Sequence, residues 1–499
     1  MVDDASDRTF LTDGRLQRHL DHLSSSSNET STVVTLLRQS NRTGLVGARL
    51  TGAAAATGDV LLFLDAHCEC TDGWLPPLLH QLQSTNDSDS IVCPVIDVIH
   101  DQTFAFARSF DRHVGGFNWN LHFRWFPPSS AVNQGGDVTS AFPTPVMAGG
   151  LFAMRRSTFW SLGGYDGGMR VWGGENIELS LRLWTCSSSR LLIHPCSHVG
   201  HLFRRSSPYS FATGGNGGNG AKKKEEGGGG GGGGGTGVLF SNLARVVDVW
   251  TDGHAPFFRT INPQLAVVAA RRGEEERATL EERRSLRRRL GCRPFSWFLD
   301  QVWGGGGHFF PDAPTSDNHK NMDKVLVQVR SLGMSGRCAE QQQSGSGGGG
   351  GHRLVTLERC SLDHNFVPQL FVYDVRRRLL QSEDSVCADL LSSSSRPRLF
   401  MNVCSFTLLS GGEEEGDDSG SDSSGRRRQR WEWREGEGRI RHEEGTADSC
   451  LSVEPNSRKL LTVVPCRDGD PMQRFLLVRI QWWPPPPPPP QDHSNHTIV

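Results

Sequence analysis

The sequence of 499 residues lacks any run of about 18 apolar residues, the length that a membrane-spanning helix requires. Its first residues also lack a cationic start followed by an apolar stretch, so they do not form a secretory signal peptide. Neither sign of charge predominates, because 53 Lys and Arg face 55 Asp and Glu. This balance argues against a chain whose main task is to coat nucleic acid or an anionic membrane.

Apolar residues are scarce, at 36 %, and much of the deficit comes from 58 Gly and 26 Pro that gather in a few segments. Segments of this composition cannot bury enough apolar surface to offset the entropy of ordering, so we expect flexible inserts there. The segments are Gly214 to Gly237, Gly304 to Gly307, the Ser/Gly run that ends at Gly351, and Gly411 to Gly425. We expect residues 481–499, with prolines 484–490, to form a disordered tail.

The 12 Cys include no CxxC pair, which argues against a zinc site made of cysteine alone. Three pairs in the last third of the chain have a regular setting that is typical of disulfides. Four Asn-x-Ser/Thr sequons permit N-glycosylation, at Asn28, Asn41, Asn86 and Asn495. The cysteines suggest an oxidising compartment, although the visible N-terminus offers no route into it.

The chain up to about residue 303 alternates apolar strand-like runs with helical patterns. Val60 to Leu64 is an unbroken apolar run, as expected of a buried parallel strand, and Ile91 to Ile96 is a second candidate. Glu175 to Trp184 has helical spacing, and residues 274–290 form a charged helix with acid-to-base pairs three and four residues apart. This alternation indicates a layered α/β domain.

Residues 326–480 contain a pattern that occurs three times: Cys-x-acid or polar residue, then Cys, then Gln-x-aromatic. Such a repeat predicts a threefold all-β unit whose copies share one core. Each internal Cys pair would form a disulfide within one repeat, and the aromatic residue of each copy would pack in the common core. The aromatic residues are Phe371, Trp431 and Phe475.

Asp65 and His67 follow the first apolar run directly. Side chains two residues apart at a strand end point the same way, into the crevice where open α/β sheets bind ligands. A carboxylate with an imidazole suits Mn²⁺ or a similar divalent ion. The same tripeptide pattern occurs elsewhere without a preceding strand, so a hydrogen-bonded Asp/His pair is an equal alternative on this pattern alone.

Residues 146–209 hold a denser group of polar and aromatic residues. Ala148-Gly149-Gly150 would let the backbone approach a ligand, and Trp172, Glu175 and Asn176 offer a ring and polar groups that suit a sugar. His198, His201 and Arg204 add possible metal ligands and a phosphate clamp. The alternative for each single residue is structural, namely a tight Gly turn that packs Trp172 into the core and histidines on the surface. The cluster as a whole favours a functional site.

Five segments of the sequence resemble the UDP-GalNAc:polypeptide N-acetylgalactosaminyltransferases. They read DAHCECTDGWLPPLL, FNWNLHFRW, AGGLFAM, VWGGEN and CSHVGHLFR, and the likeness extends with inserts from Val2 to about Ile480. It implies a Rossmann-like GT-A glycosyltransferase domain over residues 1–303 and a linker over 304–325. A ricin B-type β-trefoil lectin domain would follow over residues 326–480.

The resemblance also implies roles for individual residues. Asp65, His67 and His201, rather than His198, would hold Mn²⁺ together with the UDP phosphates. Glu175 and Asn176 would bind the donor sugar and orient the acceptor hydroxyl. The other implied donor or pocket contacts are Asp4, Arg42, Arg49, Ala148, Gly149, Gly150, Trp172, Arg204 and Tyr209.

The activity implied is transfer of GalNAc from UDP-GalNAc to Ser or Thr of a polypeptide, with the anomeric configuration retained and no protein nucleophile. This reaction initiates mucin-type O-glycosylation in the Golgi. The alternative is a catalytically impaired fragment or paralogue that binds GalNAc or glycopeptides, and a glycosyltransferase with another donor is a third hypothesis. No nucleic-acid partner is expected.

The sequence also departs from the family pattern. It begins at VDDASD, which resembles the end of the family's second core strand, so we expect the membrane anchor, stem and first strand of a Golgi type II protein to be absent. Cys196 would then be a free thiol, whereas Cys186 and Cys292 match a family disulfide. In the lectin region only Asp389 keeps the family's sugar-binding carboxylate two residues after Cys, with Glu340 and Ser452 in the other copies.

Overall fold

The computed structural model describes residues 1–26, 34–84, 89–109, 112–126, 137–203, 235–303, 308–313, 322–342, 353–361, 366–383, 386–391, 397–404, 429–443 and 448–482. Met1–Asp252 and Pro263–His308 lie in one compact unit, and Gly253–Asn262 lie with the described residues from Phe309 in a second. The sequence prediction assigned residues 253–262 to the first domain. Their helix α9 (Ala255–Ile261) instead packs Phe257 against Phe310 and Trp482 of the second unit.

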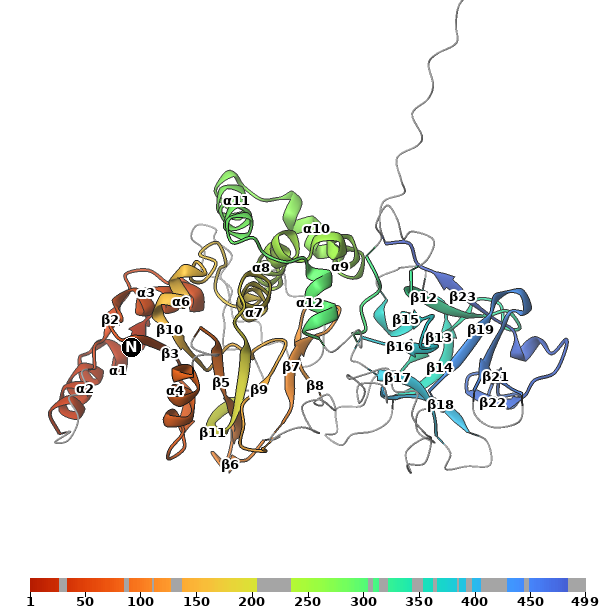
Figure 1. The fold of residues 1–499 in the computed structure, drawn as a ribbon, viewed down its shortest axis with the longest axis horizontal. Helices are drawn as coiled ribbons and strands as arrows, with labels where there is room; N and C mark the ends of the chain where they lie inside the picture. The colour runs from red at the N-terminus through yellow and green to blue at the C-terminus, as the bar shows by residue number, and fades with distance from the viewer. Residues whose placement is uncertain are drawn as a thin grey trace, which may run out of the picture. The chain divides into compact units, whose positions relative to one another are not determined.

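The main sheet of the first unit has the strand order β3-β10-β5-β11-β4 (Figure 1). These strands are β3 (Val60–Phe63), β10 (Phe152–Arg155), β5 (Ile91–His100), β11 (Leu191–Phe203) and β4 (Cys68–Cys70), with β6 (Phe106–Ala107) beside β5 and β9 (Phe142–Pro143) beside β11. β5 and β11 run parallel, as expected of the second apolar run. The prediction of a parallel strand for the first run was wrong, because β3 pairs antiparallel with β10.

Burial along β3 explains that error. Leu61 and Phe63 are buried, Val60 and Leu62 are half-buried, and Leu64 beyond the strand is 39 % exposed. The apolar run therefore reflects a strand with unequal faces. Its half-buried residues, Val60 and Leu62, pack against the core formed by Leu78, Leu82, Val92 and Ala153. Pairing direction depends on which distant strand lies alongside, and hydropathy does not encode it.

Two further small sheets belong to this unit. β1 (Val2–Asp3) pairs in parallel with β2 (Leu37–Arg38), and β7 (Val114–Phe117) forms a hairpin with β8 (Phe123–Phe126). Helices α1 (Thr9–Thr12) and α2 (Arg15–Ser26) connect β1 to β2, and α3 (Gly44–Ala55) follows β2. The carboxyl ends of β1 and β2 thus lead towards the start of α3.

Helices pack on the main sheet and on one another. α4 (Leu75–Gln83) contacts β5, β10 and β11, and α6 (Arg156–Ser161) contacts β10. α7 (Glu175–Cys186) contacts β11 and is flanked by α8 (Gly235–Trp250) and α12 (Phe295–Gln301), while α10 (Pro263–Ala270) and α11 (Glu274–Arg289) contact α8 (Figure 1). The helices predicted at Glu175–Trp184 and at 274–290 are therefore present.

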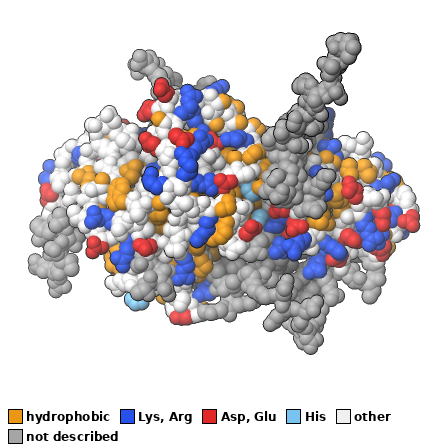
Figure 2. Space-filling view, turned by 45° about the horizontal axis from the view of Figure 1, so that its top comes forward, with side chains coloured by type: hydrophobic (Ala, Val, Ile, Leu, Met, Phe, Trp, Pro, Cys, Tyr) orange, Lys and Arg blue, Asp and Glu red, His pale blue; other side chains and the backbone are white. Residues whose placement is uncertain are grey.

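α11 carries opposite charges at its two ends. Three Glu occupy its first turn and three Arg its last, which complements the helix dipole. On the face drawn in Figure 2, acidic and basic side chains are interspersed, in keeping with the balanced composition. Among the described helices, none is long and apolar enough to cross a membrane.

In its described residues, the second unit forms a twelve-stranded β-sheet structure that contains the three repeats. The strands are β12 (Lys324–Ser331), β13 (Arg337–Gln341), β14 (Arg353–Arg359), β15 (Phe371–Asp374), β16 (Leu379–Gln381), β17 (Val386–Leu391), β18 (Arg398–Val403), β19 (Trp431–Arg434), β20 (Arg439–His442), β21 (Ser449–Val453), β22 (Leu461–Pro465) and β23 (Phe475–Arg479). Each repeat contains one disulfide. Phe371, Trp431 and Phe475 are at most 2 % exposed in one common core, as the repeat pattern predicted.

The start of the tail differs from the prediction. Trp482 is 4 % exposed and packs against Phe257 and His254, so the ordered chain extends beyond residue 480. An indole ring buries a large apolar area, which accounts for its fixed position. Residues 483–499 and most of the Gly-rich segment 214–237 lie outside the described residues.

Candidate active site

A cavity of about 600 Å³ lies in the first unit. Residues at the ends of strands β3 and β11, at the start of helix α7 and on strand β8 line it. Ten candidate residues line it, namely Arg49, Asp65, His67, Ala148, Gly149, Gly150, Trp172, Glu175, Asn176 and His201. Segments more than a hundred residues apart in the sequence therefore meet at one place.

Asp65, His67 and His201 form a compact group in this cavity. Asp65 follows β3, His67 precedes β4, and His201 lies on β11, which pairs with β4. One potential ligand atom from each lies within 4.8 Å of the others, and Nε2 of His201 is 3.5 Å from Oδ2 of Asp65. Within the described part of the chain, this is the one group of three or more His, Cys, Asp or Glu with such geometry.

This group has the chemistry of a divalent-metal site. One carboxylate and two imidazoles suit Mn²⁺ and ions of similar hardness. Nδ1 of His201 is buried and has no hydrogen-bond partner among the described residues, so a polar atom of this group is left unsatisfied there. Burial alone would raise the pKa of Asp65, but the hydrogen bond from His201 and the charge of Arg49 hold that pKa below its usual value. The residues present fit Mn²⁺.

Arg49 connects Asp65, a member of the candidate metal-binding group, to the glycine turn. From α3 its guanidinium donates to Oδ1 of Asp65 at 2.8 Å, to the Gly149 carbonyl at 2.6 Å and to the Gly150 carbonyl at 3.2 Å. It also donates to the hydroxyl of Tyr165 at 3.1 Å. Burial opposes its protonation, but the charges of Tyr165, Asp65 and Glu175 outweigh this and raise the pKa of Arg49. Arg49 therefore holds Asp65 in place as an ionised carboxylate.

The two glycines of the AGG turn make room for side chains of the site. Gly149 has φ +95°, and a Cβ there would lie 2.6 Å from Cβ of Asn176. A Cβ at Gly150 would lie 2.6 Å from Oδ2 of Asp65. The sequence interpretation assigned these glycines to close approach of a ligand, and the structure adds that two site side chains already need the space.

The start of α7 supplies two buried polar groups. Gly173 and Gly174 have φ +107° and +86°, and this turn directs Glu175 and Asn176 into the cavity wall. Oε2 of Glu175 accepts from the amide of Gly173 at 2.8 Å, and burial raises the pKa of Glu175. Nδ2 of Asn176 donates to the Met147 carbonyl at 3.0 Å.

The position of Trp172 decides between the two interpretations of this glycine turn, a functional site or a turn that packs Trp172 into the core. Its side chain is 40 % exposed and lines the cavity, so the alternative in which the turn packs Trp172 into the core is wrong. His198 does fit the structural alternative, because Nδ1 bonds to Asp97 and Nε2 to the Pro195 carbonyl, both at 2.9 Å.

Asp4 and Arg42 are not among the described residues that line the cavity. The carboxylate of Asp4 instead accepts from the Thr43 amide, the Thr43 hydroxyl and the Gly44 amide, at 2.7 to 2.9 Å. It thereby satisfies amides at the start of α3. Arg42 is exposed beside it. Arg204 and Tyr209 lie outside the described residues.

Sequence reasoning missed one wall of the cavity. Leu121, His122, Phe123, Arg124 and Trp125 line it from the loop before β8 and from β8 itself. Trp125 is 40 % exposed, with its ring edge-on to Phe123 at 5.0 Å between centroids. The aromatic density of FNWNLHFRW was a usable signal for this wall. Leu239 and Leu243 of α8 also line the cavity, and nothing in the sequence marks them.

The disulfides and free thiols are as follows. Cys186–Cys292 joins the end of α7 to the segment after α11, and Cys338–Cys360, Cys387–Cys404 and Cys450–Cys466 close the three repeats. Cys196 is exposed and unpaired, as are Cys68 and Cys70, while Cys93 is buried. These pairings equal those implied by the resemblance.

In the second unit, Asp389 lies in a polar cluster. Its Oδ2 accepts from Asn402 and from Gln429, both at 3.0 Å, and it is 6 % exposed. Gln429 is the Gln of the repeated Gln-x-aromatic pattern. Asn402, which pairs across the strands with Cys387, was missed by the sequence interpretation.

The strand register shows how the other two repeats differ. The position of Asn402 is taken by Glu358 in the first repeat and by Val464 in the third. The carboxylate position carries Glu340 and Ser452 there. In the first repeat Glu340 accepts from the Gln369 amide at 2.8 Å, so the feature of the middle repeat is the second amide, from Asn402.

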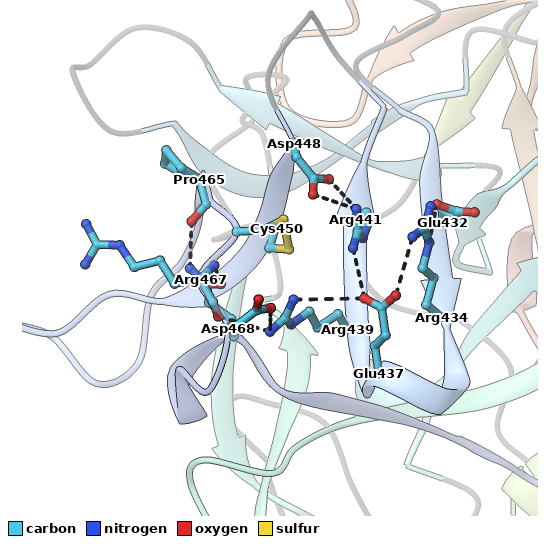
Figure 3. Close-up of a disulfide and its surroundings, with 12 residues drawn as sticks. Glu432, Arg434, Glu437, Arg439, Arg441, Asp448, Cys450, Pro465, Arg467 and Asp468 are labelled. Carbon is cyan, nitrogen blue, oxygen red and sulfur yellow. Dashed lines mark hydrogen bonds and ion pairs between the residues drawn. A yellow bond between two sulfur atoms is a disulfide. The ribbon is translucent and has the colours of Figure 1, made fainter.

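The surface next to Cys450–Cys466 is crossed by ion pairs instead (Figure 3). Arg441 binds Asp448 and Glu437, and Arg439 donates to Asp468 at 2.9 Å. These pairs join the β19–β20 hairpin to the start of β21 and to the turn after β22.

The fold and the cavity define a nucleotide-sugar type glycosyltransferase unit followed by a β-trefoil lectin unit, and comparisons with known proteins agree. Residues 2–163 match the family "Glycosyl transferase family 2", and residues 137–203 match "N-terminal domain of galactosyltransferase". Residues 325–475 match "Ricin-type beta-trefoil lectin domain".

The chain belongs to the polypeptide N-acetylgalactosaminyltransferase family. It is 35 % identical to polypeptide N-acetylgalactosaminyltransferase 11 of Xenopus tropicalis over 489 residues, which cover 96 % of this chain and 70 % of the relative. Identity is 43 % to enzyme 3 of Drosophila melanogaster and 43 % to enzyme 13 of Homo sapiens. Those two matches cover 62 % and 61 % of this chain but only 42 % and 48 % of the relatives' length.

A solved structure supports the fold. The crystal structure of GalNAc-T7 with UDP, GalNAc and Mn²⁺ aligns with a TM-score of 0.53 and 23 % identity, covering 95 % of this chain and 74 % of that chain. At this identity the likeness supports the fold alone, namely a GT-A domain followed by a trefoil domain.

Proposed function

We propose that this chain transfers GalNAc from UDP-GalNAc to the hydroxyl of Ser or Thr in polypeptides, with retained anomeric configuration and dependence on Mn²⁺. One observation carries the proposal: Asp65, His67 and His201 converge in the same cavity as Glu175 and Asn176. A metal group beside buried sugar-binding groups is what transfer from a nucleotide sugar requires. Membership of the family, whose name states the transferred sugar and the polypeptide acceptor, supports the same reaction.

In this proposal Asp65, His67 and His201 hold the metal. Mn²⁺ bound there would neutralise the charge that develops on the departing diphosphate. Arg49 keeps Asp65 ionised and aimed at the site through their 2.8 Å bond. Ala148, Gly149 and Gly150 lie against the donor, and Asp4, Arg42, Arg204 and Tyr209 complete the proposed donor contacts.

Glu175 acts as a positioning group rather than as a nucleophile. One of its carboxylate oxygens already accepts from the Gly173 amide, and the side chain is 5 % exposed. A carboxylate fixed in this way can accept a hydrogen bond from a sugar hydroxyl. Covalent catalysis instead requires a carboxylate that is free to attack the anomeric carbon. Asn176 would orient the acceptor hydroxyl, and Trp172 would cover the sugar.

The test is Mn²⁺-dependent release of UDP from UDP-GalNAc in the presence of a Thr-rich peptide. His201→Ala should lower the rate at least about 100-fold, because it removes a metal ligand. His19→Ala is the matched control, since that histidine is exposed on α2 and is not among the described residues that line the cavity. Equal rates for the wild type and His201→Ala would overturn the proposal.

A second candidate function is binding of GalNAc-bearing glycopeptides through Asp389. The coexistence of Asp389, Asn402 and Gln429 in the middle repeat favours it, because sugar hydroxyls need a carboxylate and an amide together. Asp389→Ala should abolish binding to a GalNAc-peptide column, and Ser452→Ala in the third repeat should not. A chain that binds this column but releases no UDP would be the impaired, lectin-like protein of the alternative.

We infer the Golgi lumen as the site of action, where GalNAc is added to secreted polypeptides. The family and the four disulfides support a lumenal protein. We propose that a membrane anchor typical of the family holds the protein there. Its partners are then Ser/Thr-containing polypeptides and their GalNAc-bearing products.

A further inference from the structure

The tripeptide Asn41-Arg42-Thr43 is the sequon that the structure describes in full. It connects β2 to α3, and all three residues are exposed. In the described part of the chain, the side-chain amide of Asn41 makes no hydrogen bond to another residue. Replacing its hydrogen with a bulky, polar group would therefore break no contact of the fold.

The backbone beside Asn41 is fixed independently of this side chain. The Asp4 carboxylate accepts from the Thr43 amide and the Gly44 amide, and the Thr43 hydroxyl bonds to Asp4 at 2.9 Å and to Gln39 at 2.7 Å. Hydrogen bonds among Asp4, Gln39, Thr43 and Gly44 hold the turn, and the exposed side chain of Asn41 takes no part in them. A glycan on Asn41 is thus compatible with the folded unit, since glycosylated positions lie on exposed segments.

The disulfides favour a compartment where sequons are modified. Four disulfides with separations of 16 to 106 residues join distant parts of the fold. Disulfides of this kind persist in the lumen of the secretory route, where N-glycosylation of Asn-x-Ser/Thr takes place.

We propose that Asn41 is N-glycosylated. The side-chain nitrogen forms a C–N bond to the anomeric carbon of an oligosaccharide carried on a polyprenyl diphosphate. The bond between that carbon and the diphosphate oxygen breaks, the lipid diphosphate leaves, and the amide nitrogen loses one proton. The proposal concerns a modification site and does not depend on the transferase activity.

The experiment directs the full 499-residue chain into the lumen of a eukaryotic secretory host through an added cleavable signal. Peptide mass spectrometry after treatment with peptide-N-glycosidase then reports whether Asn41 has been converted to Asp. We expect conversion at Asn41 in the wild type. Asn41→Gln should lose this glycan and still form the Cys186–Cys292 disulfide of the same unit, because the Asn41 side chain has no fold contact.

Two substitutions at Thr43 test whether the modification requires the sequon. Thr43→Ser keeps both the sequon and a hydroxyl for Asp4, so the glycan should remain. Thr43→Ala removes both, so the glycan should be lost. Recovery of the Asn41 peptide wholly unmodified, from wild-type chain whose Cys338–Cys360 disulfide shows passage through the lumen, would overturn the proposal.

Discussion

At the scale of single residues, Arg49 joins the parts of the candidate site. It contacts the Asp65 carboxylate, two carbonyls of the glycine turn and the Tyr165 hydroxyl. Asp65 and His67 could be found from the sequence because they directly follow an apolar run. Tyr165 could not, since a buried Tyr beside an Arg has no pattern of spacing. His201 needed either the resemblance or the fold, because nothing local separates it from His198.

Removing the Arg49 charge should destabilise the first unit. Arg49→Gln leaves Asp65 mostly buried without its ion-pair partner, and we expect a loss of about 3 kcal/mol in the free energy of unfolding. Urea denaturation measures this loss. Arg288→Gln is the control, because Arg288 pairs with Glu281 in solvent and such pairs contribute at most about 1 kcal/mol. Equal losses for the two variants would contradict the role given to Arg49.

Adding a methyl group at Gly150 should weaken metal binding. The new Cβ would lie 2.6 Å from Oδ2 of Asp65, so the carboxylate must move away from the histidines. We expect Gly150→Ala to lower Mn²⁺ affinity at least about 10-fold, measured by calorimetric titration. Gly167→Ala is the control, since a Cβ there has nothing within 4 Å. Unchanged affinity in Gly150→Ala would show that Asp65 is not a ligand.

At the scale of helices and strands, local sequence patterns predicted where helices and strands occur better than they predicted how the strands pair. α7 and α11 have the predicted positions because their apolar or charge spacing is helical. The parallel neighbour predicted for β3 was wrong, because strand order depends on chain segments far away in sequence. The trefoil was predictable because its core residues recur in three copies. The β8 wall was missed because a motif of aromatic residues fits a core equally well.

The buried pair on α7 provides a test at this scale. Arg182 and Glu178 are at most 1 % exposed and form two bonds, and Arg182 also donates to the Leu162 and Gly164 carbonyls. Arg182→Met should cost about 3–5 kcal/mol, because it leaves Glu178 as an uncompensated buried charge. Adding Glu178→Met should recover part of that loss in thermal unfolding. If the double variant were less stable by the sum of both single losses, the two residues would not be coupled.

At the scale of the whole molecule, the two units differ in how they are cross-linked. The second unit has three disulfides across 16 to 22 residues, and the first has one across 106. In the chain-entropy treatment each short loop contributes about 3 kcal/mol and the long one about 4.7 kcal/mol. Reduction should therefore lower the melting temperature of the second unit more than that of the first, as calorimetry with and without dithiothreitol would show. A larger shift in the first unit would contradict this.

The central claim is that Asp65, His67 and His201 bind one divalent ion in a cavity that takes a nucleotide sugar. Scanning calorimetry with Mn²⁺ and UDP tests it most directly. Ligands at about 100 times their dissociation constant should stabilise the first unit by about 2.7 kcal/mol. We predict that this stabilisation occurs in the wild type and in His19→Ala and is lost in His201→Ala. A wild-type melting temperature that does not change with Mn²⁺ and UDP would contradict the account.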